Sequence, residues 1–163
     1  MGAGKTTVGR RLAARLGLGF VDLDEVLVQR FGCDVGAVFA DHGEPAFRTA
    51  EREELTAVLA GPEAVIAVGG GAWCDPGSRA AARAAGAVAV WLDVPWPELW
   101  RRLSASSGGR PLLADEAATR ALYEARRGDY SASDLAVSLD AGTTSDAAAA
   151  LLHAALVEVA CAT

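Results

Sequence analysis

Lysine is nearly absent from this chain: of its 15 lysine and arginine residues, only Lys5 is a lysine. Cysteine is also scarce, and a total of three does not make a disulfide framework. No apolar stretch approaches the ~18 residues that cross a bilayer. No charged segment followed by an apolar core marks a signal peptide. These absences predict a cytoplasmic protein that does not span a membrane.

Positive charge is in the minority, since 21 acidic residues leave a net charge of −6. A chain with this balance is not expected to bind nucleic acid or an anionic membrane surface. Any anion that it binds must be held by a local group of cations. The length of 163 residues suits one domain of ordinary size. We therefore expect residues 1–163 to form a single domain, and a monomer.

The one lysine lies in a phosphate-binding pattern. Gly4-Lys5-Thr6 matches the end of GxxxxGK[ST], in which backbone N–H groups hold phosphates, the lysine reaches the β- and γ-phosphates, and the hydroxyl binds Mg²⁺. The predicted loop comprises Gly2, Ala3, Gly4, Lys5, Thr6 and Thr7. The first glycine of the pattern would fall two residues before Met1. The motif predicts a nucleotide site.

Short apolar runs alternate with segments of helical periodicity along the chain. The predicted strands are residues 19–23, 64–68, 87–94 and 135–139. The predicted helices are residues 5–16, 25–31, 35–41, 45–59, 78–85, 95–103, 116–127 and 145–160. Residues 104–115 are predicted to form a mobile loop. The alternation predicts an α/β protein with a parallel sheet covered by helices on both faces.

Candidate side chains follow the predicted strands, and ligands of α/β sheets bind beyond the carboxyl ends of the strands. Asp22 and Asp24 end the first predicted strand. One carboxylate can hold Mg²⁺ through water and the other can accept a hydroxyl proton, although such an aspartate can also simply cap a helix. The three glycines at 69–71 indicate a backbone that approaches a ligand closely. Arg48 and Glu51 alone would be an ordinary surface pair.

Six short motifs occur in order over nearly the whole chain. They are Met1-Gly-Ala-Gly-Lys-Thr-Thr-Val-Gly9, Phe20-Val-Asp-Leu-Asp24, Phe47-Arg-x-x-Glu51, Val68-Gly-Gly-Gly71, Arg110-Pro-Leu-Leu113, and Arg126 four residues before Tyr130. Together they resemble the shikimate kinases. The resemblance implies a three-layer P-loop kinase fold with a parallel sheet of strand order 2-3-1-4-5. Strand 1 of that order, the first along the chain, has no counterpart in this sequence. We expect the natural start to lie roughly ten residues upstream, because without strand 1 the core would open and strand edges would be unpaired.

The same resemblance implies that the chain transfers the γ-phosphoryl group of ATP to the 3-hydroxyl of shikimate, giving shikimate 3-phosphate and ADP. Residues 2–7 would bind the ATP phosphates, with Lys5 on the β- and γ-phosphates. Thr6 would bind Mg²⁺ directly and Asp22 through water. Arg110, in a lid at residues 104–115, would close over the phosphates, and Arg102 would contact the adenine.

The resemblance also assigns the acceptor site. Asp24 would bind the shikimate hydroxyls and take the proton of the one that is phosphorylated. Arg48 and Arg126 would bind the shikimate carboxylate, and Glu51 would orient Arg48. The remaining implied substrate contacts are Gly69, Gly70 and Gly71.

Three alternatives stay open. The family often has Pro-Leu before the tyrosine where this chain has Gly128-Asp129, so Arg127 could replace Arg126 in the substrate site. A gluconate-type kinase would share the phosphate loop, and a paralogue without catalytic activity would share most of the motifs. A GTP-dependent switch is excluded, because its Asn-Lys-x-Asp motif needs a second lysine.

Overall fold

The computed structural model describes residues 2–105 and 115–162, which form eight helices and four strands. The strands are β1 (Gly19–Asp22), β2 (Ala64–Ala67), β3 (Val90–Asp93) and β4 (Leu135–Ser138). The helices are α1 (Lys5–Leu16), α2 (Leu23–Phe31), α3 (Val35–Leu59), α4 (Gly70–Cys74), α5 (Pro76–Ala84), α6 (Trp96–Ala105), α7 (Glu116–Tyr130) and α8 (Ser145–Ala162). Strands alternate with helices, as the sequence predicted.

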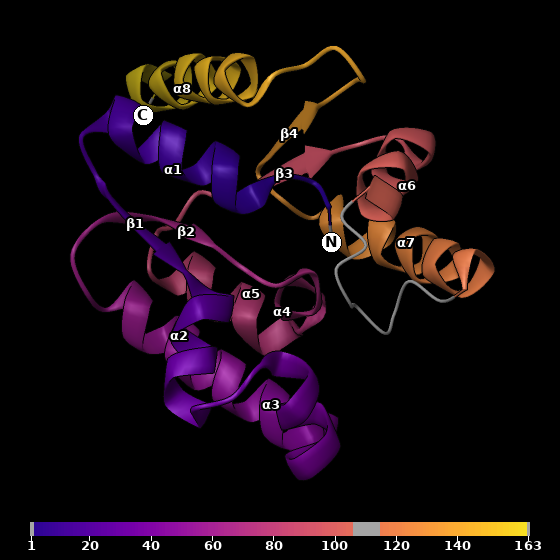
Figure 1. The fold of residues 1–163 in the computed structure, drawn as a ribbon. Coiled ribbons are helices and arrows are strands. Elements are labelled where there is room, and N and C mark those ends of the chain that lie inside the picture. Colours follow the sequence, from indigo (N-terminus) through magenta and orange to yellow (C-terminus); the bar gives the residue numbers. More distant parts are fainter. Residues whose placement is uncertain (1, 106–114, 163) are drawn as a thin grey trace.

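All strand pairing in the described residues is parallel. β1 pairs with β2 from Gly19↔Ala64 to Asp22↔Ala67. β3 pairs with β4 from Val90↔Leu135 to Asp93↔Ser138. The carboxyl ends within each pair therefore lie at the same edge, which brings the ends of β1 and β2 next to each other. The helices lie on both sides of these strands (Figure 1).

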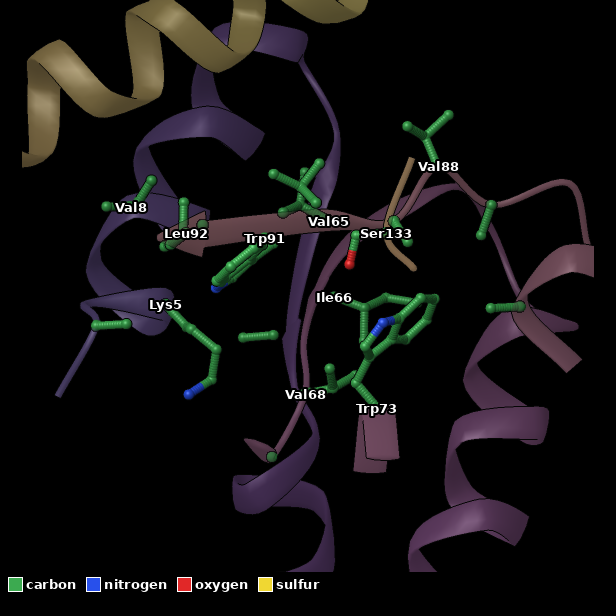
Figure 2. Close-up of a pocket in the computed structure, with 18 of the residues that line it drawn as sticks. Lys5, Val8, Val65, Ile66, Val68, Trp73, Val88, Trp91, Leu92 and Ser133 are labelled. Atoms are coloured by element: carbon green, nitrogen blue, oxygen red, sulfur yellow. The ribbon is translucent and has the colours of Figure 1, made fainter. Parts of the chain in front are cut away.

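An apolar cavity of about 730 Å³ lies between the two strand pairs. β2 and β3 both line it, for instance with Val65 and Leu92, and Figure 2 shows these side chains together with Trp91 and Trp73. In the described part of the chain the two pairs are separate two-stranded sheets. The expected family order puts a strand between them, and that strand stays a prediction.

Two clusters of buried side chains form the core. One joins α1, α6 and α8, and its buried members are Val8, Leu12, Val94, Trp96, Leu99, Leu103, Leu139, Ala148, Ala149 and Leu152. The other joins α2 to α3 through Leu23, Leu27, Val38, Phe47, Ala50 and Leu55. The helical spacing of these apolar residues is the pattern from which the helices were predicted. None of the described helices is long and apolar enough to cross a membrane.

The structure departs from the sequence prediction at four elements, and one of them is α7, which continues three residues past its predicted end at Arg127. The three glycines start a short helix, α4, because Ala72 is fully buried there and packing outweighs the poor helix propensity of glycine. The predicted helices 35–41 and 45–59 run together as α3, with a kink at Gly43, whose φ of 76° is left-handed. β3 is shorter than predicted, since the amide of Ala87 bonds to Ala82 of the preceding helix end and not to a strand.

Candidate active site

The phosphate loop leads directly into α1. Gly2 and Gly4 have φ values of 67° and 88°, which other residues rarely adopt. A side chain at Gly2 would also place its first carbon 3.0 Å from the Leu103 side chain. Lys5 begins the helix and lines the cavity, as Figure 2 shows. No side chain of the described residues caps the start of α1, and the N-terminus of a helix is a favourable place for phosphate.

Thr6 and Asp22 lie together beside this loop. The Thr6 hydroxyl donates to Asp22 Oδ2 at 2.6 Å, and Asp22 Oδ1 accepts from the backbone N–H of Asp24 at 3.1 Å. Asp22 thus caps α2, which is one of the two interpretations weighed from the sequence, and it also accepts from Thr6 beside the loop. Its role in holding Mg²⁺ stays a prediction. A hydroxyl and a carboxylate suit Mg²⁺, which prefers oxygen ligands and usually takes few from the protein. Among the described residues, no group of three or more His, Cys, Asp or Glu could hold a metal on its own.

Asp24 and Glu51 meet at the end of β2. A first side-chain carbon at Gly69 would lie 2.8 Å from Glu51 Oε1 and 3.2 Å from Asp24 Oδ1. A larger residue at Gly69 would therefore require the Glu51 side chain to shift. The register of β1 and β2 and the packing of α3 against α2 therefore bring residues from three distant segments together.

Arg48 is fixed from two sides. It donates to Glu51 Oε2 at 2.5 Å and to Glu44 Oε1 at 3.2 Å, and its guanidinium lies 5.3 Å from the centre of the Phe47 ring. Glu51 is only 2 % exposed, and burial raises the pKa of its carboxyl while the Arg48 guanidinium opposes this. The Arg48 guanidinium also lies against Gly71, where a larger residue would require this side chain to shift. This is more than the ordinary surface pair that the spacing alone suggests.

Arg126 lies beside Gly70, in the segment of residues 69–71 at the start of α4 that we call the glycine turn. A side chain at Gly70 would lie 3.2 Å from Arg126 Nη1 and 2.6 Å from the Tyr130 hydroxyl. Arg127 instead donates to both oxygens of Asp93 at 2.7 and 3.1 Å, and its guanidinium lies 4.8 Å from the centre of the Trp91 ring. Of the two arginines, Arg126 is the one beside the predicted substrate site.

The two remaining predicted ATP contacts are Arg102 and Arg110. Arg102 Nε donates to Glu98 at 2.6 Å, and hydrogen bonds from Arg101 and Arg102 lower the pKa of Glu98 to about 2. The adenine role of Arg102 stays a prediction. Arg110 lies outside the described residues, as does most of the predicted lid.

Sequence reasoning gave no role to two residues that the structure puts at this site. Glu44 is a second carboxylate that pairs with Arg48, and its position four residues before Arg48 was the sequence signal for that pair. Tyr130 donates from its hydroxyl to the Gly70 carbonyl at 3.1 Å. Its position one helical turn after Arg126 was the available signal, but which residue it meets depends on how α7 packs against α4.

Residues 1–156 match the family described as shikimate kinase. The chain belongs to that family. It is 39 % identical to a shikimate kinase of Synechococcus sp. (strain CC9605) over 94 % of this chain and 77 % of the relative. It is 42 % identical to that of Synechococcus sp. (strain RCC307), over 94 % and 79 %.

Solved structures of the family match the fold. The shikimate kinase from Acinetobacter baumannii in complex with shikimate is similar with a TM-score of 0.86 and 31 % identity, over 97 % of this chain and 89 % of that chain. The shikimate kinase from Aquifex aeolicus is similar with a TM-score of 0.83 and 27 % identity, over 100 % and 95 %. The predicted α/β kinase fold and the predicted ATP-dependent kinase activity are thereby confirmed.

Proposed function

We propose that this protein transfers the γ-phosphoryl group of ATP to the 3-hydroxyl of shikimate. The observation that carries this proposal is the glycine turn at 69–71, which has Arg48 on one side, Arg126 on the other and Asp24 next to Gly69. Two cations and one carboxylate around a half-buried backbone suit a small acceptor that carries both a carboxylate and hydroxyls. Gluconate also carries a carboxylate and hydroxyls, so it is the family match over residues 1–156 that favours shikimate over a gluconate-type acceptor.

The acceptor is held by charge and by backbone. Arg48 and Arg126 bind its carboxylate, and Glu51 keeps Arg48 in place through the 2.5 Å bond. Gly69, Gly70 and Gly71 let the main chain approach the ring of the acceptor. Asp24 accepts the proton of the attacking hydroxyl, which is the task of the carboxylate in phosphoryl transfer.

The donor is held by the loop at 2–7, which includes Ala3 and Thr7. Its amides and Lys5 bind the phosphates, and Thr6 and Asp22 hold Mg²⁺, the latter through water. Bound there, Mg²⁺ would neutralise charge on the phosphoryl oxygens. Catalysis then rests on positioning and electrostatics, with Arg110 and the lid closing over the site and Arg102 near the adenine. We also propose that the protein is a cytoplasmic, single-domain monomer.

The test is a coupled assay of ADP release with shikimate, with gluconate as the alternative acceptor and with calorimetry of shikimate binding in parallel. We expect release that depends on shikimate and not on gluconate. Binding without turnover would favour a paralogue without catalytic activity, and neither binding nor turnover would reject the function. Arg126→Ala should weaken shikimate binding, while Arg120→Ala, an exposed arginine on the same helix, serves as the matched control.

A further inference from the structure

Tyr130 connects the end of α7 to the glycine turn. Its hydroxyl donates to the carbonyl of Gly70 at 3.1 Å, although the two residues are 60 positions apart in the chain. Burial raises the pKa of the Tyr130 phenol, so it is neutral at ordinary pH and its proton stays available for this bond. The bond therefore ties α7 to α4, two elements that pack against each other.

Arg126 lies beside the same phenol. Both side chains lie against Gly70, at 2.6 Å for the Tyr130 hydroxyl and 3.2 Å for Arg126 Nη1 from the position of an added side-chain carbon. Within residues 2–105 and 115–162, no carboxylate lies within ion-pair distance of Arg126. Its nearest described neighbour is the neutral Tyr130 phenol, and Glu51 and Cys74 interact with it electrostatically from farther away.

Arg48, the other predicted carboxylate ligand, has the opposite surroundings. It bonds to the carboxylates of Glu51 and Glu44, which together outweigh its own charge. A cation already matched by carboxylates contributes geometry more than attraction for an anion. Of the two arginines, Arg126 is therefore the one without a described carboxylate at ion-pair distance, and whatever orients Arg126 decides how its charge meets the acceptor.

We propose that Tyr130 is a positioning residue that holds Arg126 against the glycine turn and so determines how tightly the acceptor carboxylate is bound. This role rests on the proposed function. A phenol suits this role because it can anchor the turn and leave the charge of Arg126 in place, whereas a carboxylate would neutralise that charge. Loss of the hydroxyl would free the end of α7 from α4, and small displacements of a binding group weaken binding measurably.

The test compares Tyr130→Phe with Tyr123→Phe. Tyr123 is also on α7 and also donates to a backbone carbonyl, that of Val94 at 3.2 Å, but it lies away from the glycine turn. We expect Tyr130→Phe to raise the KM for shikimate roughly 2- to 12-fold, the loss of one ordinary hydrogen bond. Its kcat and its KM for ATP should stay unchanged, and Tyr123→Phe should leave the KM for shikimate unchanged.

Comparing shikimate with a second acceptor distinguishes a change in the position of Arg126 from a general loosening of the site. The methyl ester of shikimate has no carboxylate charge, so the preference for acid over ester should narrow in Tyr130→Phe and stay wide in Tyr123→Phe. In an Arg126→Ala background, Tyr130→Phe should have no further effect on the KM for shikimate. An unchanged preference, or full additivity with Arg126→Ala, would overturn the role.

Hydrogen exchange gives a readout that does not need activity. Tyr130→Phe should speed amide exchange in residues 70–74, and Tyr123→Phe should not. If the wild-type protein failed to bind shikimate, the proposed function would fall, and exchange in this segment would decide by itself whether Tyr130 holds the turn. Unchanged exchange would then refute the role as well.

Discussion

Glu51→Gln is expected to weaken substrate binding without weakening the fold at neutral pH. Glu51 is 2 % exposed, and burial raises the pKa of its carboxyl against the opposing effect of Arg48. The folded protein thus binds a proton at Glu51 more tightly than the unfolded chain does. The contribution of this carboxyl to the free energy of unfolding is then largest at pH values below ~4.3, the ordinary value for glutamate, and declines as pH rises through the raised pKa.

The expected stability result follows from that sign. Because glutamine does not ionise, the stability of Glu51→Gln relative to wild type should rise between pH 4 and pH 7. Replacing one member of a buried ion pair is usually costly, but Arg48 is 26 % exposed and keeps Glu44 as a partner. Urea denaturation of both proteins across this pH range measures the difference.

For substrate binding, the same substitution is expected to be unfavourable and to raise the KM for shikimate. Arg48 would lose a charged hydrogen bond of 2.5 Å and keep at most a neutral one. Exchanging the carboxylate for an amide roughly halves such a bond, which corresponds to about 1 kcal/mol, or roughly fivefold in the KM for shikimate. The measurement is the KM for shikimate at saturating ATP, with kcat expected to change less.

Glu44→Gln is the matched control, because it makes the same change on the same arginine. Glu44 is 64 % exposed at 3.2 Å from Arg48, so its loss should change stability by less than about 0.5 kcal/mol and the KM by less than about twofold. A larger effect on the KM from Glu44→Gln than from Glu51→Gln would refute the reasoning. So would a stability of Glu51→Gln that falls, relative to wild type, as the pH rises.

Three further predictions concern the phosphate loop, the lid and the core. Thr6→Val removes the hydroxyl that donates to Asp22 at 2.6 Å, and kcat should fall about 10²-fold with a higher Mg²⁺ requirement, whereas Thr6→Ser should restore activity; equal kcat values for the two variants would count against a metal role. Arg110→Ala should lower kcat by about 10³-fold in steady-state assays, and a change confined to the KM for shikimate would exclude the lid role. Gly9→Ala would put a methyl carbon 2.6 Å from the Phe20 ring, so denaturation should show a loss of about 1–3 kcal/mol; an unchanged midpoint would mean that the ring moves freely.

The sequence by itself determined the kind of fold and the chemistry. The Gly4-Lys5-Thr6 pattern predicts a phosphate site because its loop conformation needs glycine, as the left-handed φ of Gly4 bears out. Short apolar runs between helices of regular period predicted every described strand within a few residues, although the residues of β4 alternate between half-buried and exposed. The carboxyl ends of those strands located the candidate site.

Only the tertiary structure decided which side chains meet. Arg126 and Arg127 are adjacent in sequence, yet the direction of each from α7 sends one to the glycine turn and the other to Asp93. The short helix at 70–74 forms through the burial of Ala72, which local propensity does not report. The hydrogen bond from Tyr130 to Gly70 depends on the packing of two elements 60 residues apart, and no local pattern carries that information.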